Sequence, residues 1–286
     1  VSVPCFFMIS GALLLGRQEP LRKHVRRLAR FLIVLAVWSA VYYLWNRFYM
    51  GTPYELRDIL TEPTEAHLWY LYAMIPIYLT LPFFQVLCRG MSMKLEKAFL
   101  AVTTAAVVLN YLLRLAGQEL YYDIPLVGDR IYAYYLYVGY YLYKYRRHTP
   151  LGQRPVLVLC LLSTAATFGI TLGVTVEQGE HYEGALTYES IFVVVAAVTF
   201  FLFMLRLGNA HIRFGERAKK VISLFCGCSF GIYLIHILFL DNYKKYMEAA
   251  DLTAWAAVPV LTAGITLVSF VCVWVIRRFK IGRKIT

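Results

Sequence analysis

Long apolar runs separated by short charged loops are the feature that most restricts how this chain of 286 residues can fold. A helix needs roughly 17 to 25 mostly apolar residues to cross a bilayer, and several runs approach or exceed that length. Hydrophobic residues make up 60% of the chain and aromatic residues 16%, and no long polar stretch suggests a separate soluble domain. The sequence therefore predicts an all-α integral membrane protein, with a single membrane-embedded domain over residues 1–286.

Nine apolar segments are candidates for spanning helices. They cover residues 2–16, 31–49, 67–88, 98–113, 129–146, 155–176, 188–206, 219–240 and 255–277. The abundant aromatic residues also suit the belts that Trp and Tyr form at membrane interfaces. We expect about nine transmembrane helices in this chain.

The loops between these segments alternate in charge. One set of loops and span ends holds 23 of the 29 Lys and Arg residues and only three acidic ones, whereas the other set is acidic overall. The basic residues that fall outside the basic set are Arg47, Arg57, Arg114, Arg130, Lys244 and Lys245. Basic loops stay in the cytoplasm, so the basic set, with the C-terminus, is expected inside the cell. The formal net charge of +12 is then a sign of membrane topology and does not indicate nucleic-acid binding.

The beginning of the sequence is unusual for such a topology. Nine spans and a cytoplasmic C-terminus place Val1 on the outer side, yet the first residue is not Met and the first apolar segment is short. One more helix upstream would give ten spans with both ends inside. We therefore expect the domain to be truncated at its N-terminus.

Several segments resemble acyltransferase family 3, the multi-span membrane O-acyltransferases. They are VPCFFMISGALLL in the first segment, RRLAR at the inner end of the second, HLWYLYAMIPIYLTLPFF in the third, YLYVGYYLYK in the fifth and SFGIYLIH in the eighth. These segments extend over almost the whole chain and occur in the family's order.

The resemblance implies a domain of ten helices that moves an acyl group, usually acetyl, from cytoplasmic acetyl-CoA to an acceptor that faces outward or lies in the membrane. Acceptors of the family include envelope sugars, exopolysaccharides and lipid-linked glycans. The family's first helix carries an Arg followed, after ten residues, by a His that is taken to be essential. We expect that main catalytic His on the helix upstream of Val1, which leaves open whether this chain is active by itself.

The eighth segment supplies the catalytic candidates. Ser229, Tyr233 and His236 are spaced by four and three residues, so a helix presents them on one face. An imidazole can take up a proton near neutral pH, and an acceptor hydroxyl must lose one as it attacks a thioester. We predict His236 and Tyr233 as catalytic residues and Ser229 as lining the passage or the acceptor side. The alternative is a histidine that is hydrogen-bonded at the interface or packed for structure.

The third segment begins with a second group of candidates near the outer surface. His67, Trp69 and Tyr72 are predicted to line the acceptor side or a passage, because two outer histidines suit an outward-facing acceptor. An aromatic belt explains Trp69 without any function. Chance placement would explain His67.

Small residues in the first and fifth segments allow two interpretations. Ser10, Gly11 and Gly139 can let helices approach closely, or they can open a passage for the acyl-pantetheine arm. We predict Ser10 and Gly11 as passage-lining residues, with close packing as the alternative.

Two arginines at the inner end of the second segment are the candidates for binding the donor. Arg27 and Arg30 lie one helical turn apart and resemble the family's Arg-x-x-Arg motif. Guanidinium groups bind phosphates through paired hydrogen bonds, and CoA carries phosphates. We predict both for acetyl-CoA binding, although topology alone also explains basic residues here.

Other kinds of site are not indicated. No P-loop, GxSxG or HExxH motif is present, so ATP hydrolysis and metalloprotease chemistry are unsupported, and no metal site is expected. The six cysteines are interpreted as small packing residues, and the cluster of Glu and His in EQGEHYEG as a solvated loop. The partners expected are the lipid bilayer, an acyl-CoA and a glycan or lipid-linked acceptor, in the plasma (inner) membrane of a bacterial cell. The alternative function is small-molecule transport or a non-catalytic membrane module, like the one joined to membrane serine racemases.

Overall fold

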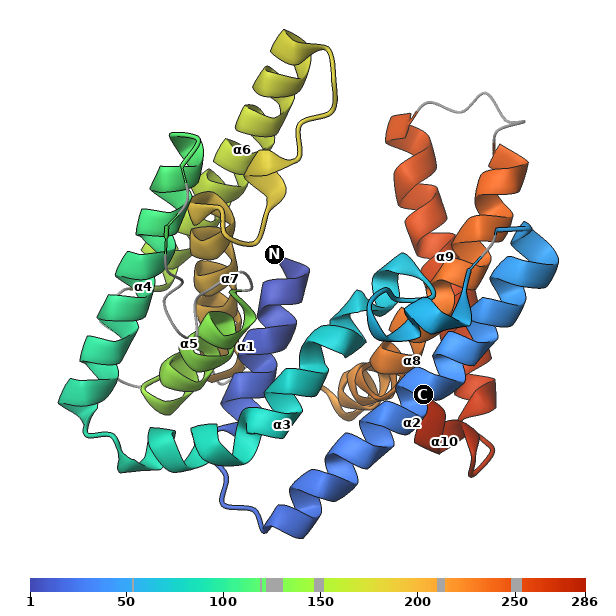
Figure 1. The fold of residues 1–286 in the computed structure, drawn as a ribbon, viewed down its shortest axis with the longest axis horizontal. Helices are drawn as coiled ribbons and strands as arrows, with labels where there is room; N and C mark the ends of the chain where they lie inside the picture. The colour runs from blue at the N-terminus through green and yellow to red at the C-terminus, as the bar shows by residue number, and fades with distance from the viewer. Residues whose placement is uncertain (53, 119, 122–130, 147–151, 210–213, 248–253) are drawn as a thin grey trace. The chain divides into compact units, whose positions relative to one another are not determined.

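The computed structural model describes residues 1–52, 54–118, 120–121, 131–146, 152–209, 214–247 and 254–286, and within these residues its regular elements are all helices (Figure 1). Short 3-10 and π helices connect or extend the α-helices. The elements are α1 (Ser2–Leu14), α2 (Leu21–Trp45), η1 (Asn46–Met50), η2 (Leu56–Leu60), η3 (Ala66–Leu68), α3 (Trp69–Gly90), α4 (Met93–Leu115), α5 (Tyr132–Lys144), α6 (Gln153–Gln178), η4 (Gly184–Leu186), α7 (Ile191–Asn209), α8 (Glu216–Met247), α9 (Ala254–Ile276) and α10 (Gly282–Ile285).

Seven helical stretches among the described residues are long and apolar enough to cross a membrane. They are Leu21–Met50, Ala66–Gly90, Met93–Leu115, Gln153–Gln178, Gly184–Gly208, Glu216–Tyr243 and Ala257–Ile276. The predicted class of all-α integral membrane protein is confirmed, and the chain is a multi-pass membrane protein.

The first and fifth predicted segments form helices that are shorter than a bilayer is thick. α1 and α5 have 13 residues each, or about 20 Å of helix, against about 30 Å of hydrocarbon. On α5 every side chain from Tyr134 to Tyr140 is buried, so protein and not lipid surrounds this stretch. The first two residues of the fifth segment, 129 and 130, lie outside the described residues. The number of nine spans, like the cytoplasmic side of the C-terminus, stays a prediction.

The chain divides into two compact units. Unit 1 consists of Val1–Pro20 and Thr80–Ile212, and unit 2 consists of Leu21–Leu79 and Arg213–Thr286. The division falls inside α3, between Leu79 and Thr80. Each unit has its own buried core, and the single domain predicted over residues 1–286 stays a prediction.

In unit 1, α1 packs against α5 and α7, and α6 packs against α7. The α1–α5 contact is very close, because a Cβ built on Gly11 would lie 1.7 Å from the carbonyl oxygen of Leu136. The contact is reciprocal, since a Cβ on Gly139 would lie 2.1 Å from the carbonyl oxygen of Met8. Only glycine fits at either position, as in other close helix pairs of membrane proteins.

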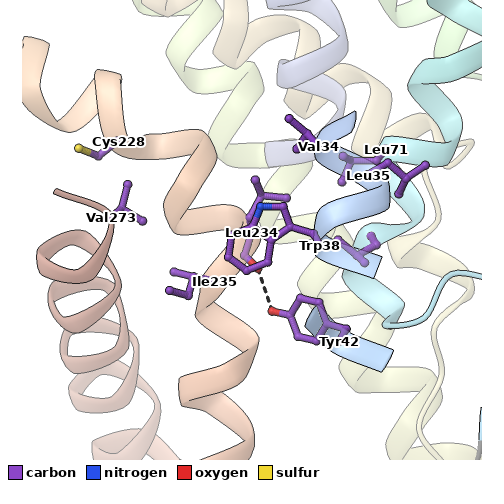
Figure 2. Packing of buried hydrophobic residues seen from close by; sticks show 10 residues of the cluster. Val34, Leu35, Trp38, Tyr42, Leu71, Cys228, Leu234, Ile235 and Val273 are labelled. Carbon is purple, nitrogen blue, oxygen red and sulfur yellow. Dashed lines mark hydrogen bonds between the residues drawn. The ribbon is translucent and has the colours of Figure 1, made fainter. Parts of the chain in front are cut away.

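In unit 2, one face of α2 forms the core together with α3, α8 and α9. Val34, Trp38 and Tyr42 repeat every four residues, which places them in one row along that face. Figure 2 shows this row beside Leu234 of α8. The other buried members of this cluster are Leu35, Leu68, Leu71, Cys228, Ile235 and Val273.

Candidate functional site

A basic pocket lies on the first turns of α2 in unit 2. It has a volume of about 590 Å³ and contains both predicted CoA ligands, Arg27 and Arg30. The residues that line it are Lys23, Arg26, Arg27, Ala29, Arg30, Ile33 and Lys284. No acidic side chain occurs among these lining residues. Guanidinium and ammonium groups held this close together favour a ligand with more than one negative charge, such as a group of phosphates.

Lys284 reaches this pocket from the other end of the chain. It belongs to α10, which packs against α2. The indole N–H of Trp38 donates a hydrogen bond of 2.9 Å to the carbonyl of Ile285 and holds α10 in place. The turn into α10 is tight, because a Cβ on Gly282 would lie 1.9 Å from the carbonyl oxygen of Ile276. Sequence reasoning did not select Lys284 as a ligand, since its position depends on this return of the chain.

A cluster of four aromatic rings forms a second feature of unit 2. Its members are Tyr42 from α2, His67 from η3, and Tyr233 and His236 from α8. The His67 ring centroid lies 4.9 Å from that of Tyr42, 5.5 Å from that of Tyr233 and 5.3 Å from that of His236. The two histidines predicted separately from the sequence are thus brought together by the fold.

Hydrogen bonds to backbone carbonyls fix the tyrosines of this cluster. The hydroxyl of Tyr42 donates to the carbonyl of Leu234 at 2.8 Å, as Figure 2 shows, and both residues are fully buried. The hydroxyl of Tyr233 donates to the carbonyl of His67. These bonds join α2, η3 and α8, so the histidines are carried on connected elements.

The hydrogen bond of His236 determines its tautomer when the ring is neutral. Nδ1 lies 2.7 Å from the carbonyl oxygen of Tyr233. A carbonyl oxygen only accepts, so Nδ1 must carry the proton and Nε2 keeps its lone pair. A neutral His236 therefore presents a proton acceptor at Nε2.

His67 differs from His236 in its polar contacts. Both of its ring nitrogens are buried and make no hydrogen bond within the described part of the chain, although the backbone of Leu234 lies close to the ring. Buried polar atoms in proteins usually have partners, and those that do not call for an explanation.

Residues 1–276 match the model of acyltransferase family 3, which is described as an acyltransferase domain. This match includes the residues of the basic pocket on α2 except Lys284, and all four members of the ring cluster. The chain belongs to this family. The resemblance seen in the sequence is thereby confirmed, and the protein is a membrane protein with an acyltransferase domain. Searches of curated proteins and of solved structures found no match.

Three further residues that were predicted to line the acceptor side or a passage lie in unit 2, outside the ring cluster. Tyr72 donates a hydrogen bond of 2.7 Å to the carbonyl of Ile59, so it anchors the loop before α3. Ser229 is exposed and donates to the carbonyl of Cys226 in its own helix. Trp69 is half-buried beside Tyr70, with ring centroids 6.2 Å apart. Their passage-lining roles stay predictions.

Ser10 and Gly11 belong to unit 1. Gly11 contacts the α5 backbone, which supports the packing interpretation of this residue. Ser10 is half-buried on the same helix.

Tyr42 is the member of the ring cluster that sequence reasoning missed. The i, i+4 row Val34, Trp38, Tyr42 was the signal that could have identified it, because that row places Tyr42 on the buried face of α2. The sequence gives no sign that His67 would lie against this face.

Proposed function

We propose that the protein transfers an acetyl group from cytoplasmic acetyl-CoA to a hydroxyl of an envelope or exported glycan, in the plasma membrane of a bacterial cell. The observation that carries this proposal is the pocket that gathers the cations of Lys23, Arg26, Arg27, Arg30 and Lys284. The family supports acyl transfer, and the pocket supports a phosphate-bearing donor. The predicted topology places these residues on the cytoplasmic side, where CoA is available.

The distance along α2 suits a donor that is bound at one end and reacts at the other. Arg30 and Tyr42 are twelve residues apart on one helix, which corresponds to about 18 Å. Tyr42 contacts His67, so the basic pocket and the ring cluster are separated by a distance comparable to the reach of a phosphopantetheine arm. Phosphates held at Arg27 and Arg30 would leave the thioester to extend toward the cluster.

The ring cluster supplies the residues for the proposed chemistry. The acceptor hydroxyl gives its proton to Nε2 of His236 while its oxygen attacks the thioester carbonyl. The C–S bond then breaks, and the CoA thiolate leaves and takes up a proton. Tyr233 positions His236 through its carbonyl oxygen, which binds the Nδ1 proton.

Acetyl-CoA binding to the full chain in detergent, followed by calorimetry, tests the donor site. We expect Arg27→Gln with Arg30→Gln to weaken binding at least about tenfold, because two charge-assisted contacts are lost. The matched control is Lys94→Gln with Lys97→Gln, which removes two exposed charges of the predicted cytoplasmic side outside the pocket. An equal loss in both variants, or none in either, would argue against the donor site.

Transfer of labelled acetyl to glycan acceptors tests the reaction itself. Membranes that hold the protein should label a glycan fraction, and the label should be released by mild alkali, as expected for an ester. Movement of a small solute without any labelled ester would favour the alternative of a transport or non-catalytic module.

A further inference from the structure

A second basic pocket lies in unit 1, and the donor site makes no use of it. It has a volume of about 580 Å³. Its cationic residues come from three places in the chain: Arg17 follows α1, Arg89 lies in the last turn of α3, and Lys144 ends α5, with Arg146 in the turn that follows. The remaining lining residues are Ala12, Leu13, Gly16, Tyr140 and Tyr143.

Buried hydrogen bonds hold the walls of this pocket in fixed positions. The buried Gln85 of α3 donates to the carbonyl of Leu14 at 2.7 Å, which fixes the end of α1. Tyr140 donates to the carbonyl of Cys88 at 3.2 Å, which fixes α5 to α3. Because these walls are already fixed, ligand binding does not have to order them, and the entropy cost of such ordering does not reduce the affinity.

Two of the pocket's cations lie beside carboxylates, whereas Arg89 lies beside none in the described part of the chain. Glu96 lies 2.8 Å from Lys144, and Glu19 lies 3.8 Å from Arg17. Arg89 donates from Nε to the carbonyl of Gln85 at 3.1 Å, and within the described residues its guanidinium has no carboxylate partner. A lining cation without a carboxylate beside it favours an anionic ligand in this pocket.

The surroundings of these cations are apolar as well as basic. Leu13 is 49% exposed and Tyr143 is 38% exposed, and both line the pocket. Arg17, Arg89, Lys144 and Arg146 all belong to the set of charges predicted for the cytoplasmic side. Exposed apolar side chains beside cations at the end of membrane helices suit a molecule with a charged head and a hydrocarbon chain.

We propose that this pocket, defined by Arg17, Arg89, Lys144 and Arg146, binds the phosphate group of an anionic phospholipid of the cytoplasmic leaflet. Basic pockets between membrane helices on this side are suited to lipid head groups. The site is separate from the donor pocket, and it does not depend on the proposed acetyl transfer.

Native mass spectrometry of the full chain in detergent, titrated with phosphatidylglycerol, tests the proposal. We expect the Arg17→Gln, Arg89→Gln variant to bind the first lipid about tenfold more weakly than the unchanged chain. Lys94→Gln with Lys97→Gln should leave binding unchanged, and zwitterionic phosphatidylcholine should bind all three chains equally. Equal binding of phosphatidylglycerol by the pocket variant and the control would overturn the site.

Two further arms keep the test decisive. Arg17→Gln alone, at a side chain that is 51% exposed, should give a smaller loss in the same direction if the double variant does not fold. Inorganic phosphate at millimolar concentration should not displace phosphatidylglycerol. Displacement would assign the pocket to soluble phosphate compounds and overturn the lipid as its ligand.

Discussion

At the scale of single residues, Glu96 shows how this protein accommodates a charge in its interior. Its side chain is fully buried, and its carboxylate accepts hydrogen bonds from Tyr140 at 3.1 Å, Lys144 at 2.8 Å and Tyr145 at 2.6 Å. A buried carboxylate is tolerated only when such partners replace water. The network also fixes Lys144 in the wall of the second basic pocket, the one proposed to bind a phospholipid.

Removing the cation of this network should destabilise the protein. We expect Lys144→Met to lower the free energy of unfolding by about 2 to 4 kcal/mol, because the buried Glu96 carboxylate would lose its cationic partner. Thermal unfolding in detergent measures the loss. The double variant Glu96→Gln, Lys144→Met should recover much of it, and a double variant that is less stable than Lys144→Met would contradict this account.

Among the residues of this chain, His236 is the one on which the proposed chemistry depends most. We expect His236→Ala to reduce acetyl transfer about a hundredfold or more while acetyl-CoA still binds, because a general base contributes to the transition state alone. Cys226→Ser, at an exposed position of the same helix, is the control and should keep full activity. Unchanged turnover in His236→Ala would return this histidine to a structural role.

At the scale of elements, the crossing of α1 and α5 depends on two glycines. In Gly11→Ala or Gly139→Ala, the added methyl group would clash with backbone atoms of the other helix, and the two helices would have to move apart. We expect each change to cost about 1 to 3 kcal/mol or more of stability, as overpacking does elsewhere. Gly169→Ala in α6, where nothing lies within 4 Å, is the matched control for thermal unfolding. Equal melting of all three variants would show that the crossing does not limit stability.

α10 has only four residues, but it brings Lys284 to the pocket lined by Arg27 and Arg30, the proposed donor site. We expect Lys284→Gln to weaken acetyl-CoA binding about two- to fivefold, the range for a solvated charge pair. Lys280→Gln removes the same charge two residues before α10 and outside the pocket, and should not change affinity. Calorimetry that gives the same affinity for both variants would remove Lys284 from the site.

At the scale of the whole molecule, the charge asymmetry predicts which ends of the helices face the cytoplasm. In a chain with Cys226→Ser, a membrane-impermeant thiol reagent should label Lys280→Cys in inverted vesicles and not in intact cells. Thr61→Cys, in the acidic loop before α3, should show the opposite pattern. Labelling of both positions from one side would contradict the predicted topology.

Much of the fold follows from the sequence, because hydrocarbon selects for one property that a sequence displays directly. Residues that face lipid or the apolar core must be apolar over the length of a helix, so helices such as α6 and α7 can be located by counting. α1 and α5, with 13 residues each, are too short to be located in this way. The stretch of α5 from Tyr134 to Tyr140 is surrounded by protein, so neither its length nor its tyrosines have to match the bilayer.

The sequence by itself determined the class of the protein, its family and the basic and histidine-containing segments, since hydropathy, charge and motifs are local along the chain. Only the tertiary structure decided which of these segments meet. It brought His67 to His236, placed Lys284 beside Arg27, and gathered Arg17, Arg89 and Lys144 around a second pocket. Contacts between residues far apart in the sequence depend on the packing of whole helices, and a close approach such as that of Gly11 to Leu136 is possible only when both partners have the right shape at the same level.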